Sequence, residues 1–481
     1  MEGEYKVTVG LEIHAELKTA TKMFCACRNN ADEKEANANI CPVCMAHPGT
    51  LPVINKEAVH KVLLAGIALG SKLAEDYTEF DRKNYFYPDI PKGYQISQYK
   101  YPLVSGGSLA GVELTRIHLE EDTARSQHVG DKSLVDYNRA GVPLMELVTE
   151  PVIHDAATAG RFAKELQLLL RYIGAGEANM EKGEMRVEAN ISVAREPQGS
   201  TLAQDSSRSN LKLGTKVEVK NLNSFRSVER AIQYETKRQI ELIESGGAVT
   251  QETRGWDEAK QVTFSQRKKE SSHDYRYFPD PDLPKLVLSE IPEFSPENLK
   301  KELPELPWEK RERYIKEGIS EEYIEMFVSD ERFGGLFEET AKLEPAAKKL
   351  IANYIGTDIA GLVAKSGEEG LRHITPAGLG VLIKGVNEGS ISSRGAKDAI
   401  AEVFAKGGDL AEVFKKYLQQ SDAGALAAIA QKVIDANPSV VAEYKAGKES
   451  VMQFLVGQGM KESKGSANPA ALREAIQKNL A

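Results

Sequence analysis

The sequence predicts an α+β protein in which a sheet-rich N-terminal part is followed by two helical parts. Several segments before residue 293 alternate apolar and charged residues with the period of a β-strand. Prolines then crowd between residues 279 and 307, which marks a boundary. The later segments have the length and composition of helices. Because 481 residues are too many for one core, we expect three domains, at 1–293, 294–407 and 408–481.

Composition narrows the class of protein. With 41% hydrophobic and 28% charged residues, the chain is typical of a globular protein. Its net charge of −9 argues against a surface that binds nucleic acid everywhere. The start, MEGEYKVTVGLEIH, lacks the basic and apolar regions of a signal peptide, and no apolar run has the length of a membrane span. We therefore expect a cytoplasmic protein without a membrane segment, with reduced cysteines.

The first expected strand is GLEIHAEL at residues 10–17, where every second side chain is apolar. Such alternation places Glu12, His14 and Glu16 together on the opposite face. The segments LTRIHLEED (114–122), GEMRVEANISV (183–193) and KVEVKN (216–221) repeat the pattern. An antiparallel sheet with one polar face explains all four segments.

Two interpretations of this polar face remain open. One face of an antiparallel sheet is often simply solvated, and this suffices for any single strand. Several strands that collect Glu, His and Arg favour a site instead. Carboxylates gather where Mg²⁺ binds, and neighbouring Arg and Lys side chains can contact phosphates.

All four cysteines lie in one polar loop at residues 25–44. A disulfide pair, a redox centre and a metal site are the alternatives, besides four unrelated buried thiols. The two close pairs, Cys25 with Cys27 and Cys41 with Cys44, can supply four sulfurs to a tetrahedral Zn²⁺. Such a site has no open position for a substrate, so its role would be structural.

Several nucleotide and nucleophile motifs are missing. The sequence contains no P-loop, no G-x-G-x-x-G after a strand and no G-x-S-x-G elbow. ATP chemistry on an open, carboxylate-lined sheet is the interpretation left. This layout resembles ligases of the glutamine synthetase type, which phosphorylate a carboxylate and let ammonia displace the phosphate.

The expected helices follow the prolines. Residues 344–365 and 375–389 form the clearest helical segments of the middle part. The last part has segments 422–447 and 467–480, and its nine Lys or Arg against eight Asp or Glu make it nearly neutral.

A tyrosine-rich loop, NYFYPDIPKGYQISQY at residues 84–99, has two interpretations. Its aromatic side chains pack on the sheet, or they line a substrate pocket together with Lys83 and Lys92.

Long segments of the chain resemble the B subunits of glutamyl- and aspartyl-tRNA amidotransferases. They include VGLEIHAELKT, NICPVCMAHPGTLPVIN, IHLEEDTARS, GEMRVEANISV and KVEVKNLNSFRSVERAIQYE, and the similarity covers almost the whole chain. The resemblance implies a heterotrimer with an amidase (A) subunit, which frees ammonia from glutamine, and a small (C) subunit. It implies that the B subunit uses ATP to phosphorylate Glu on tRNA(Gln) or Asp on tRNA(Asn), and that ammonia then displaces the phosphate. Which tRNA is used stays open.

The resemblance also implies a fold and site residues. The N-terminal domain would be an antiparallel-sheet cradle, and the last domain a helical tail that contacts tRNA. Glu12, His14 and Glu121 would bind Mg²⁺, and the four cysteines would bind Zn²⁺. The implied catalytic residues are Glu12, His14, Glu120, Glu121, Arg186, Glu188 and Lys220. The implied ATP-binding residues are Glu12, His14, Glu121, Asp122, Glu184, Asn190 and Asn221.

Three further points follow from the resemblance. Which member of the run Glu120, Glu121 and Asp122 ligates the metal stays open. A metal-bound His14 must be neutral, so we expect activity to fall below about pH 6. Tyr354 stands where the family usually has Trp, within the helical part.

A free-standing ligase for a small acid and a non-catalytic tRNA scaffold are the alternative functions.

Overall fold

The computed structural model describes residues 5–74, 76–195, 213–268, 275–418, 423–463 and 467–480. The chain divides into two compact units, Met1–Leu306 and Pro307–Ala481. The first unit runs past residue 293 because helix α4 (Pro296–Glu302) contacts helix α1 (Lys56–Ala68). The domain boundaries expected after residues 293 and 407 stay predictions.

In the described part of the first unit, a ten-stranded sheet has the order β14-β13-β12-β11-β1-β10-β7-β5-β2, and β6 pairs with β7. The strands are β1 (Tyr5–Glu16), β2 (Lys72–Leu73), β5 (Val104–Ser105), β6 (Ser108–Leu109), β7 (Val112–Glu121), β10 (Pro143–Thr149), β11 (Met185–Arg195), β12 (Val217–Leu222), β13 (Glu252–Asp257) and β14 (Val262–Lys268).

The central strands follow the antiparallel arrangement that the sequence predicts. Pairing is antiparallel from β7 through β10, β1 and β11 to β12. The sheet differs from the expectation at one described pair, because β12 and β13 run parallel. Helix α3 (Phe225–Glu244) joins these two strands and supplies the crossover that a parallel pair needs. The α+β class is confirmed.

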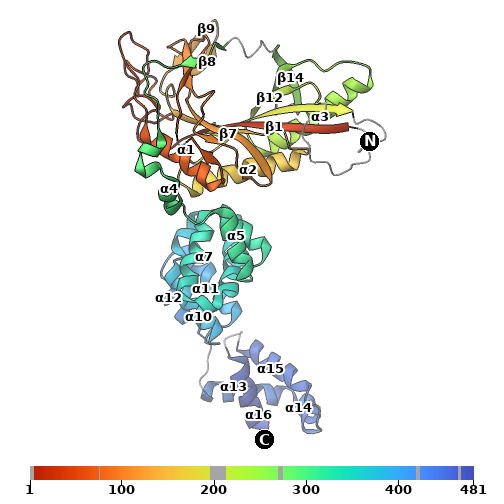
Figure 1. The fold of residues 1–481 in the computed structure, drawn as a ribbon. Coiled ribbons are helices and arrows are strands. Elements are labelled where there is room, and N and C mark those ends of the chain that lie inside the picture. Colours follow the sequence, from red (N-terminus) through yellow and green to blue (C-terminus); the bar gives the residue numbers. More distant parts are fainter. Residues whose placement is uncertain are drawn as a thin grey trace. The chain divides into compact units, whose positions relative to one another are not determined.

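The apolar face of the sheet is covered by helices. Leu11, Ile13 and Ala15 of β1 are all 0% exposed. Helix α2 (Ala156–Tyr172) contacts β1, and α3 contacts β11. Figure 1 shows α1 and α2 on one side of the sheet. Because the apolar residues of each strand belong to this core, the alternating charged residues lie on the other face.

Smaller elements stand around the polar face. A three-stranded sheet has the order β15-β3-β4, with β3 at Asp81–Asn84, β4 at Tyr94–Ser97 and β15 at Phe278–Pro279. Its strand β4 contacts β7. Strands β8 (Arg125–Val129) and β9 (Lys132–Asp136) form a separate hairpin, which Figure 1 shows on the side of the sheet away from α1 and α2.

The second unit is helical where it is described. Its helices before residue 419 are α5 (Pro307–Lys316), α6 (Glu321–Ser329), α7 (Glu331–Leu343), α8 (Lys348–Asn353), α9 (Ala360–Ser366), α10 (Pro376–Asn387), α11 (Ser393–Lys406) and α12 (Leu410–Val413). A π-helical turn, Tyr354–Ile359, joins α8 to α9. Tyr354 is only 4% exposed, so its side chain belongs to the packed core of these helices.

The last four helices have a core of their own. They are α13 (Ala423–Ala436), α14 (Pro438–Lys445), α15 (Val451–Glu462) and α16 (Pro469–Leu480). Leu426, Ala430, Leu455, Leu472 and Ile476 belong to one buried cluster within this segment. Among the described helices of the whole chain, none combines the length and the apolar character that crossing a membrane requires.

Candidate active site and cysteine cluster

Strand register places the charged residues of four neighbouring strands in rows. His118 of β7 lies opposite Glu146 of β10, Glu146 lies opposite His14 of β1, and His14 lies opposite Arg186 of β11. In the adjacent row, Glu12 lies opposite Glu188. Directly opposed side chains have Cβ atoms about 4.5–5.5 Å apart. The polar face is therefore one continuous charged surface.

His14 lies between two carboxylates. Its Nε2 is 3.4 Å from Oε1 of Glu120 and 3.4 Å from Oε2 of Glu146. One ligand atom from each of the three residues lies within 4.8 Å of the others. Both glutamates are buried. Two carboxylate oxygens and one imidazole nitrogen are donors that fit Mg²⁺ or Mn²⁺.

The surrounding carboxylates set the protonation of His14. Burial favours the neutral imidazole, but the hydrogen bond and charge of Glu146, with the charges of Glu120 and Glu188, raise the pKa of His14 to about 9. Burial would raise the pKa of Glu146, yet His118 and His14 hold it well below its usual value. Without a metal, His14 is therefore a protonated partner of these carboxylates at neutral pH.

A lysine of the smaller sheet faces the same cluster. Burial disfavours the ammonium of Lys83, but the charges of Glu120, Tyr277 and Glu146 raise the pKa of Lys83 above its usual value. Lys83 therefore stays positively charged beside the metal-type cluster. The tyrosine-rich loop that follows Lys83 supplies Lys92, which pairs with Glu121.

A second group of carboxylates lies beside the first. Ligand atoms of Glu12, Glu188 and Glu218 are within 4.8 Å of one another. Asn190 Nδ2 donates to Oε1 of Glu12 at 2.8 Å, and Lys220 Nζ donates to Oε1 of Glu188 at 3.0 Å. Oδ1 of Asn190 is buried and accepts no hydrogen bond from any described residue. This orphaned oxygen and the three carboxylates form an oxygen-rich donor set that fits Mg²⁺.

Lys220 keeps its charge in this group. Burial favours the neutral amine, but the charges of Glu188 and Glu218 raise the pKa of Lys220. A cation that stays charged beside carboxylates can neutralise an arriving phosphate.

Glu121 lies outside the cluster in which we expected it. Strand alternation turns its side chain away from that of Glu120, and its Oε1 accepts the backbone N–H of Ile96 at 2.9 Å. Its carboxylate also pairs with Lys92. Of the acidic run, Glu120 is the residue that faces His14. The structure thus gives Glu121 a link to β4, and it does not bring Glu121 to Glu12 and His14.

Asp122 forms the end of the polar face with two arginines. Arg186 donates to Oδ2 of Asp122 at 2.6 Å, and Nε of Arg139 lies 3.5 Å from the same oxygen. Arg186 Nε is buried and donates to no described residue. Burial and the charge of Asp122 raise the pKa of Glu16 to about 7. An acidic residue that titrates near neutrality therefore borders the site.

Two residues assigned to ATP binding have other surroundings. Oε2 of Glu184 accepts the backbone N–H of Asn179 at 3.0 Å, so this carboxylate holds the turn before β11. Asn221 has a φ of 65° and an exposed side chain, at an irregular point of the β11–β12 pairing. Neither belongs to the two carboxylate clusters. Their roles in ATP binding stay predictions.

Sequence reasoning did not assign Glu146 and Glu218 to the site. Glu146 is the only charged residue of β10 (PLMELVT), and a lone carboxylate in such an apolar strand is a usable signal. Glu218 alternates with Lys220 in KVEVKN, so its face was evident, but its partners Glu12 and Glu188 come from other strands. Only the strand order reveals these two contributions.

The tyrosine-rich loop shows features of both interpretations. The rings of Tyr99 and Tyr277 stack with centroids 4.4 Å apart, and Tyr85 packs edgewise on Tyr275 at 6.0 Å. Phe86 is 84% exposed. The loop therefore packs on the segment that holds Tyr275 and Tyr277, and the ammonium of the neighbouring Lys83 lies over the ring of Tyr275, 5.2 Å from its centroid.

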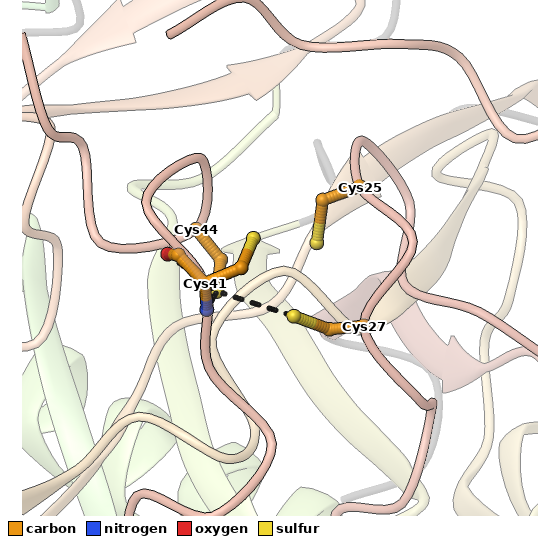
Figure 2. A group of neighbouring side chains, drawn as sticks. All are labelled: Cys25, Cys27, Cys41 and Cys44. Carbon is orange, nitrogen blue, oxygen red and sulfur yellow. Dashed lines mark hydrogen bonds between the residues drawn. The ribbon is translucent and has the colours of Figure 1, made fainter.

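The four cysteines come together as two facing pairs. Figure 2 shows Cys25 and Cys27 on one segment and Cys41 and Cys44 on the other, with the sulfurs pointing toward one another. All four sulfurs lie within 4.8 Å of one another, and Sγ of Cys27 is 4.0 Å from Sγ of Cys44. No pair is a disulfide. Zn–S bonds of about 2.3 Å in a tetrahedron place sulfurs about 4 Å apart, so this donor set fits Zn²⁺.

The thiols differ in their acidity. Hydrogen bonding with Cys25 lowers the pKa of Cys44 to about 5, although burial acts against it, and the backbone of Cys41 and the charge of Lys22 contribute. Burial raises the pKa of Cys27 to about 12. One sulfur of the cluster is thus prepared as a thiolate, the form that binds a metal.

Comparison with known proteins agrees with this geometry. Residues 7–292 match the family model described as the GatB/GatE catalytic domain, and residues 335–480 match the one described as the GatB domain. Curated relatives named as B subunits of aspartyl/glutamyl-tRNA(Asn/Gln) amidotransferase include proteins of Crocosphaera subtropica and Carboxydothermus hydrogenoformans, each 41% identical, and of Caldanaerobacter subterraneus subsp. tengcongensis, 43% identical.

These alignments span nearly complete proteins. Each covers 99% of this chain and 98–99% of the relative. The matched regions include both carboxylate clusters, the cysteine cluster and the helical tail. The chain therefore belongs to the GatB family, the B subunits of aspartyl/glutamyl-tRNA(Asn/Gln) amidotransferases.

Proposed function

We propose that this chain is the part of a glutamine-dependent tRNA amidotransferase that uses ATP to convert Glu-tRNA(Gln) or Asp-tRNA(Asn) to the amide. The observation that carries the proposal is the polar face, where two metal-type clusters share one surface with three cations. The clusters are His14–Glu120–Glu146 and Glu12–Glu188–Glu218. The cations are Lys83, Arg186 and Lys220.

The reaction needs this combination of charges. The side-chain carboxylate of the aminoacyl group attacks the γ-phosphorus of ATP, which gives an acyl phosphate and ADP. Two anions must approach each other, so their charges have to be neutralised beforehand. Bound Mg²⁺ would supply electrostatic stabilisation of the phosphates.

The charged residues of the polar face would bind the metals and the transferred phosphate. His14, Glu120 and Glu146 would hold one metal, and Glu12, Glu188 and Glu218 with Asn190 would hold a second. Lys83 and Lys220 would contact the transferred phosphate. In the second step ammonia attacks the acyl carbon, the C–O bond to phosphate breaks, and a base accepts the excess proton.

Other parts of the complex complete the proposal. The cysteine cluster would hold a structural Zn²⁺, because four sulfurs leave no open position for a substrate. The sequence has no G-x-S-x-G elbow, and zinc would occupy all four cysteines, so glutamine would be hydrolysed by a separate amidase (A) subunit. A small (C) subunit would complete a heterotrimer. Both mischarged tRNA classes remain candidate substrates. The place of action would be the cytoplasm, where aminoacyl-tRNAs are made.

Two alternatives make different predictions. A free-standing ligase would amidate a small acid without partner subunits and without tRNA. A tRNA-binding scaffold would hydrolyse no ATP under any condition. ATP turnover by the purified chain, with and without the partner subunits and mischarged tRNA, separates the three.

The decisive test uses Glu12→Gln, which removes one charge and keeps the side-chain shape. In the reconstituted complex with Glu-tRNA(Gln), phosphate release and amide formation are measured separately. We expect both to fall by at least about 100-fold, since metal-held charge stabilisation contributes several kcal/mol. The glutaminase activity of the partner should be retained in part, because its chemistry lies in another chain.

The matched control is Glu113→Gln, on the exposed part of β7. It makes the same chemical change outside both clusters, and normal rates are expected. If Glu12→Gln also released phosphate at the normal rate, this face of the sheet would not be the ATP site.

A further inference from the structure

The side chain of Lys22 is completely buried, at 0% exposure. Its Nζ donates to the carbonyl oxygen of Tyr137 at 3.1 Å and lies 4.0 Å from Sγ of Cys44. Within the described residues, Lys22 forms no ion pair with a carboxylate. Burying an ammonium is costly unless an anion compensates it. The adjacent group that becomes anionic when it ligates a metal is the sulfur of Cys44.

The local fold fixes Lys22 at the cysteine cluster. The backbone N–H of Lys22 donates to the carbonyl of Cys27 at 2.9 Å, and Thr21 bridges to Arg28. Lys22 thus begins the turn that carries Cys25 and Cys27. Its side chain reaches across to Cys44 on the facing segment. The position of the ammonium follows from the turn that shapes the cluster.

The metal site requires such a cation. Four thiolates around one Zn²⁺ leave a net charge of about −2, which has to be compensated inside the protein. One backbone donor is present, since the N–H of Cys41 points to Sγ of Cys44 at 3.1 Å. The nearby Lys92 lines a cavity together with Cys44, but its ammonium pairs with Glu121. Among the residues that the structure describes, Lys22 is the buried cation left beside the sulfurs.

We propose that Lys22 is the counter-charge of the four-cysteine zinc site, whose ammonium offsets part of the negative charge of the metal–thiolate group. This rests on the zinc site of the proposed function and adds to it a residue that binds no metal itself. Lys22 is then a positioning residue that sets metal affinity.

The proposal predicts effects of different size with and without metal. In the metal-free chain the ammonium faces one thiolate, that of Cys44, and not a group of four metal-bound sulfurs, so an apolar side chain of similar length should cost far less stability than in the zinc-bound chain. In the zinc-bound chain the same replacement removes the compensation. If Lys22 merely filled space, methionine would fill the same space and zinc affinity would stay unchanged.

The experiment compares Lys22→Met, Lys22→Gln and Lys22→Arg in the full-length chain. Zinc affinity is measured by competition with a chromophoric chelator, and thermal unfolding is recorded with and without Zn²⁺. Lys34→Met is the matched control, since Lys34 lies exposed in the same loop. We expect Met and Gln at position 22 to weaken zinc binding about 10- to 100-fold, the range for residues that support metal ligands. Arg should stay within a few-fold of the wild type.

The outcomes separate the explanations. Unchanged zinc affinity in Lys22→Met would overturn the inference, and so would a metal-free Lys22→Met chain that fails to fold. Wild-type affinity in Lys22→Gln, with a loss only in Lys22→Met, would assign the effect to the hydrogen bond with Tyr137 and overturn the role of the charge. A wild-type chain that binds no zinc would refute the zinc site itself, whatever Lys22 does.

Discussion

Glu146 is the carboxylate on which the two histidines of the polar face converge. Its Oε2 lies 3.4 Å from Nε2 of His14 and 3.4 Å from Nε2 of His118, and Arg116 approaches its other oxygen at 3.8 Å. Burial would raise the pKa of Glu146, but its interactions with His118 and His14 hold this pKa well below its usual value, so Glu146 stays ionised. An ionised, buried carboxylate is held ready to ligate a metal without first losing a proton.

We therefore predict that Glu146→Gln weakens binding of Mn²⁺, used as a probe for Mg²⁺, by at least about tenfold. Replacing the ligand by an amide removes one negative charge from a site with three protein donors. Mn²⁺ titration followed by electron paramagnetic resonance measures the effect, with Glu113→Gln as the control. A normal Mn²⁺ affinity in Glu146→Gln would show that the His14 cluster is not a metal site.

A second prediction at this scale concerns pH. The pKa of His14 is raised from 6.5 to about 9, so its protonated form stabilises the metal-free fold below pH 6.5, and this contribution is lost as pH rises through 9. A metal at Nε2 must displace that proton. Metal affinity should therefore rise about tenfold per pH unit between pH 7 and 9.

The same Mn²⁺ titration repeated across this range tests the prediction. His14→Gln has no such proton to lose and should show weak, pH-independent binding. The pH range in which metal affinity changes lies above the pH of about 6 expected for an ordinary histidine. The reason is that carboxylates from other strands surround His14 and stabilise its protonated form. A flat profile in the wild type would contradict the role of His14.

What the sequence reveals about the site depends on how local each signal is. Alternation within one strand is local, so it indicated correctly that Glu12 and His14 share a face. Which carboxylates meet His14 depends on strand order, and β10 separates β1 from β7 only in the fold. Alternation along β7 separates Glu120 and Asp122 from Glu121, but it does not say which of these two carboxylates comes close to His14 in the folded sheet.

At the scale of elements, the cysteine loop is tied to the end of the polar face. The N–H of Met23 donates to the carbonyl of Gly141 at 2.7 Å, and the N–H of Gly141 donates to the carbonyl of Asp122 at 2.9 Å. Gly141 has a φ of 85°, a conformation that favours glycine. A cluster that closes the loop therefore also supports the backbone that presents Asp122 to Arg186.

Removing the metal should loosen this connection. We predict that zinc chelation, or Cys44→Ser, increases hydrogen exchange at residues 120–124 and 139–142, since the loop has few apolar contacts to hold it otherwise. Exchange in β11, at the centre of the sheet, should stay unchanged and serves as the internal control. If hydrogen exchange around Asp122 did not change after zinc loss, the cysteine cluster would stabilise only its own loop.

Strands and helices differ in how far sequence predicts them. The apolar faces of β1 and β11 follow from period-two patterns, and burial of Ile13 and Val187 agrees with them. The parallel pairing of β12 with β13 leaves no such mark, because it is decided by the route of α3 across the sheet. Candidate metal donors within a short loop, like the cysteines, are easier to assign than donors that come from five strands.

For the whole molecule, the sequence predicted the change from sheet to helices well. The proline-rich stretch lies where the sheet ends, and helices follow it. The compact unit nevertheless continues to Leu306, since α4 packs on α1, and no composition change marks that contact. A function that needs several chains, such as ammonia delivery, cannot be recognised from the residues of one chain. Its only trace is that the chain lacks residues for that step.

The last prediction concerns the tail of helices α13–α16. Its apolar residues form a cluster within the segment, so deleting residues 423–481, which keeps α12 on α10 and α11, should leave the fold of the first unit and the proposed ATP site intact. We expect the shortened chain, assembled with its partners, to show a KM for mischarged tRNA raised about tenfold or more, with little change in the KM for ATP.

Residues 409–481 carry nine cationic and eight anionic side chains, so the tail region is nearly neutral. Few phosphate contacts are then available, so the tail's contribution should depend only weakly on salt. Amidation measured against tRNA concentration at two salt concentrations tests both parts. An unchanged KM for tRNA would show that the tail takes no part in tRNA recognition. A steep salt dependence would show that the tail binds tRNA through charged contacts with phosphates and not through shape.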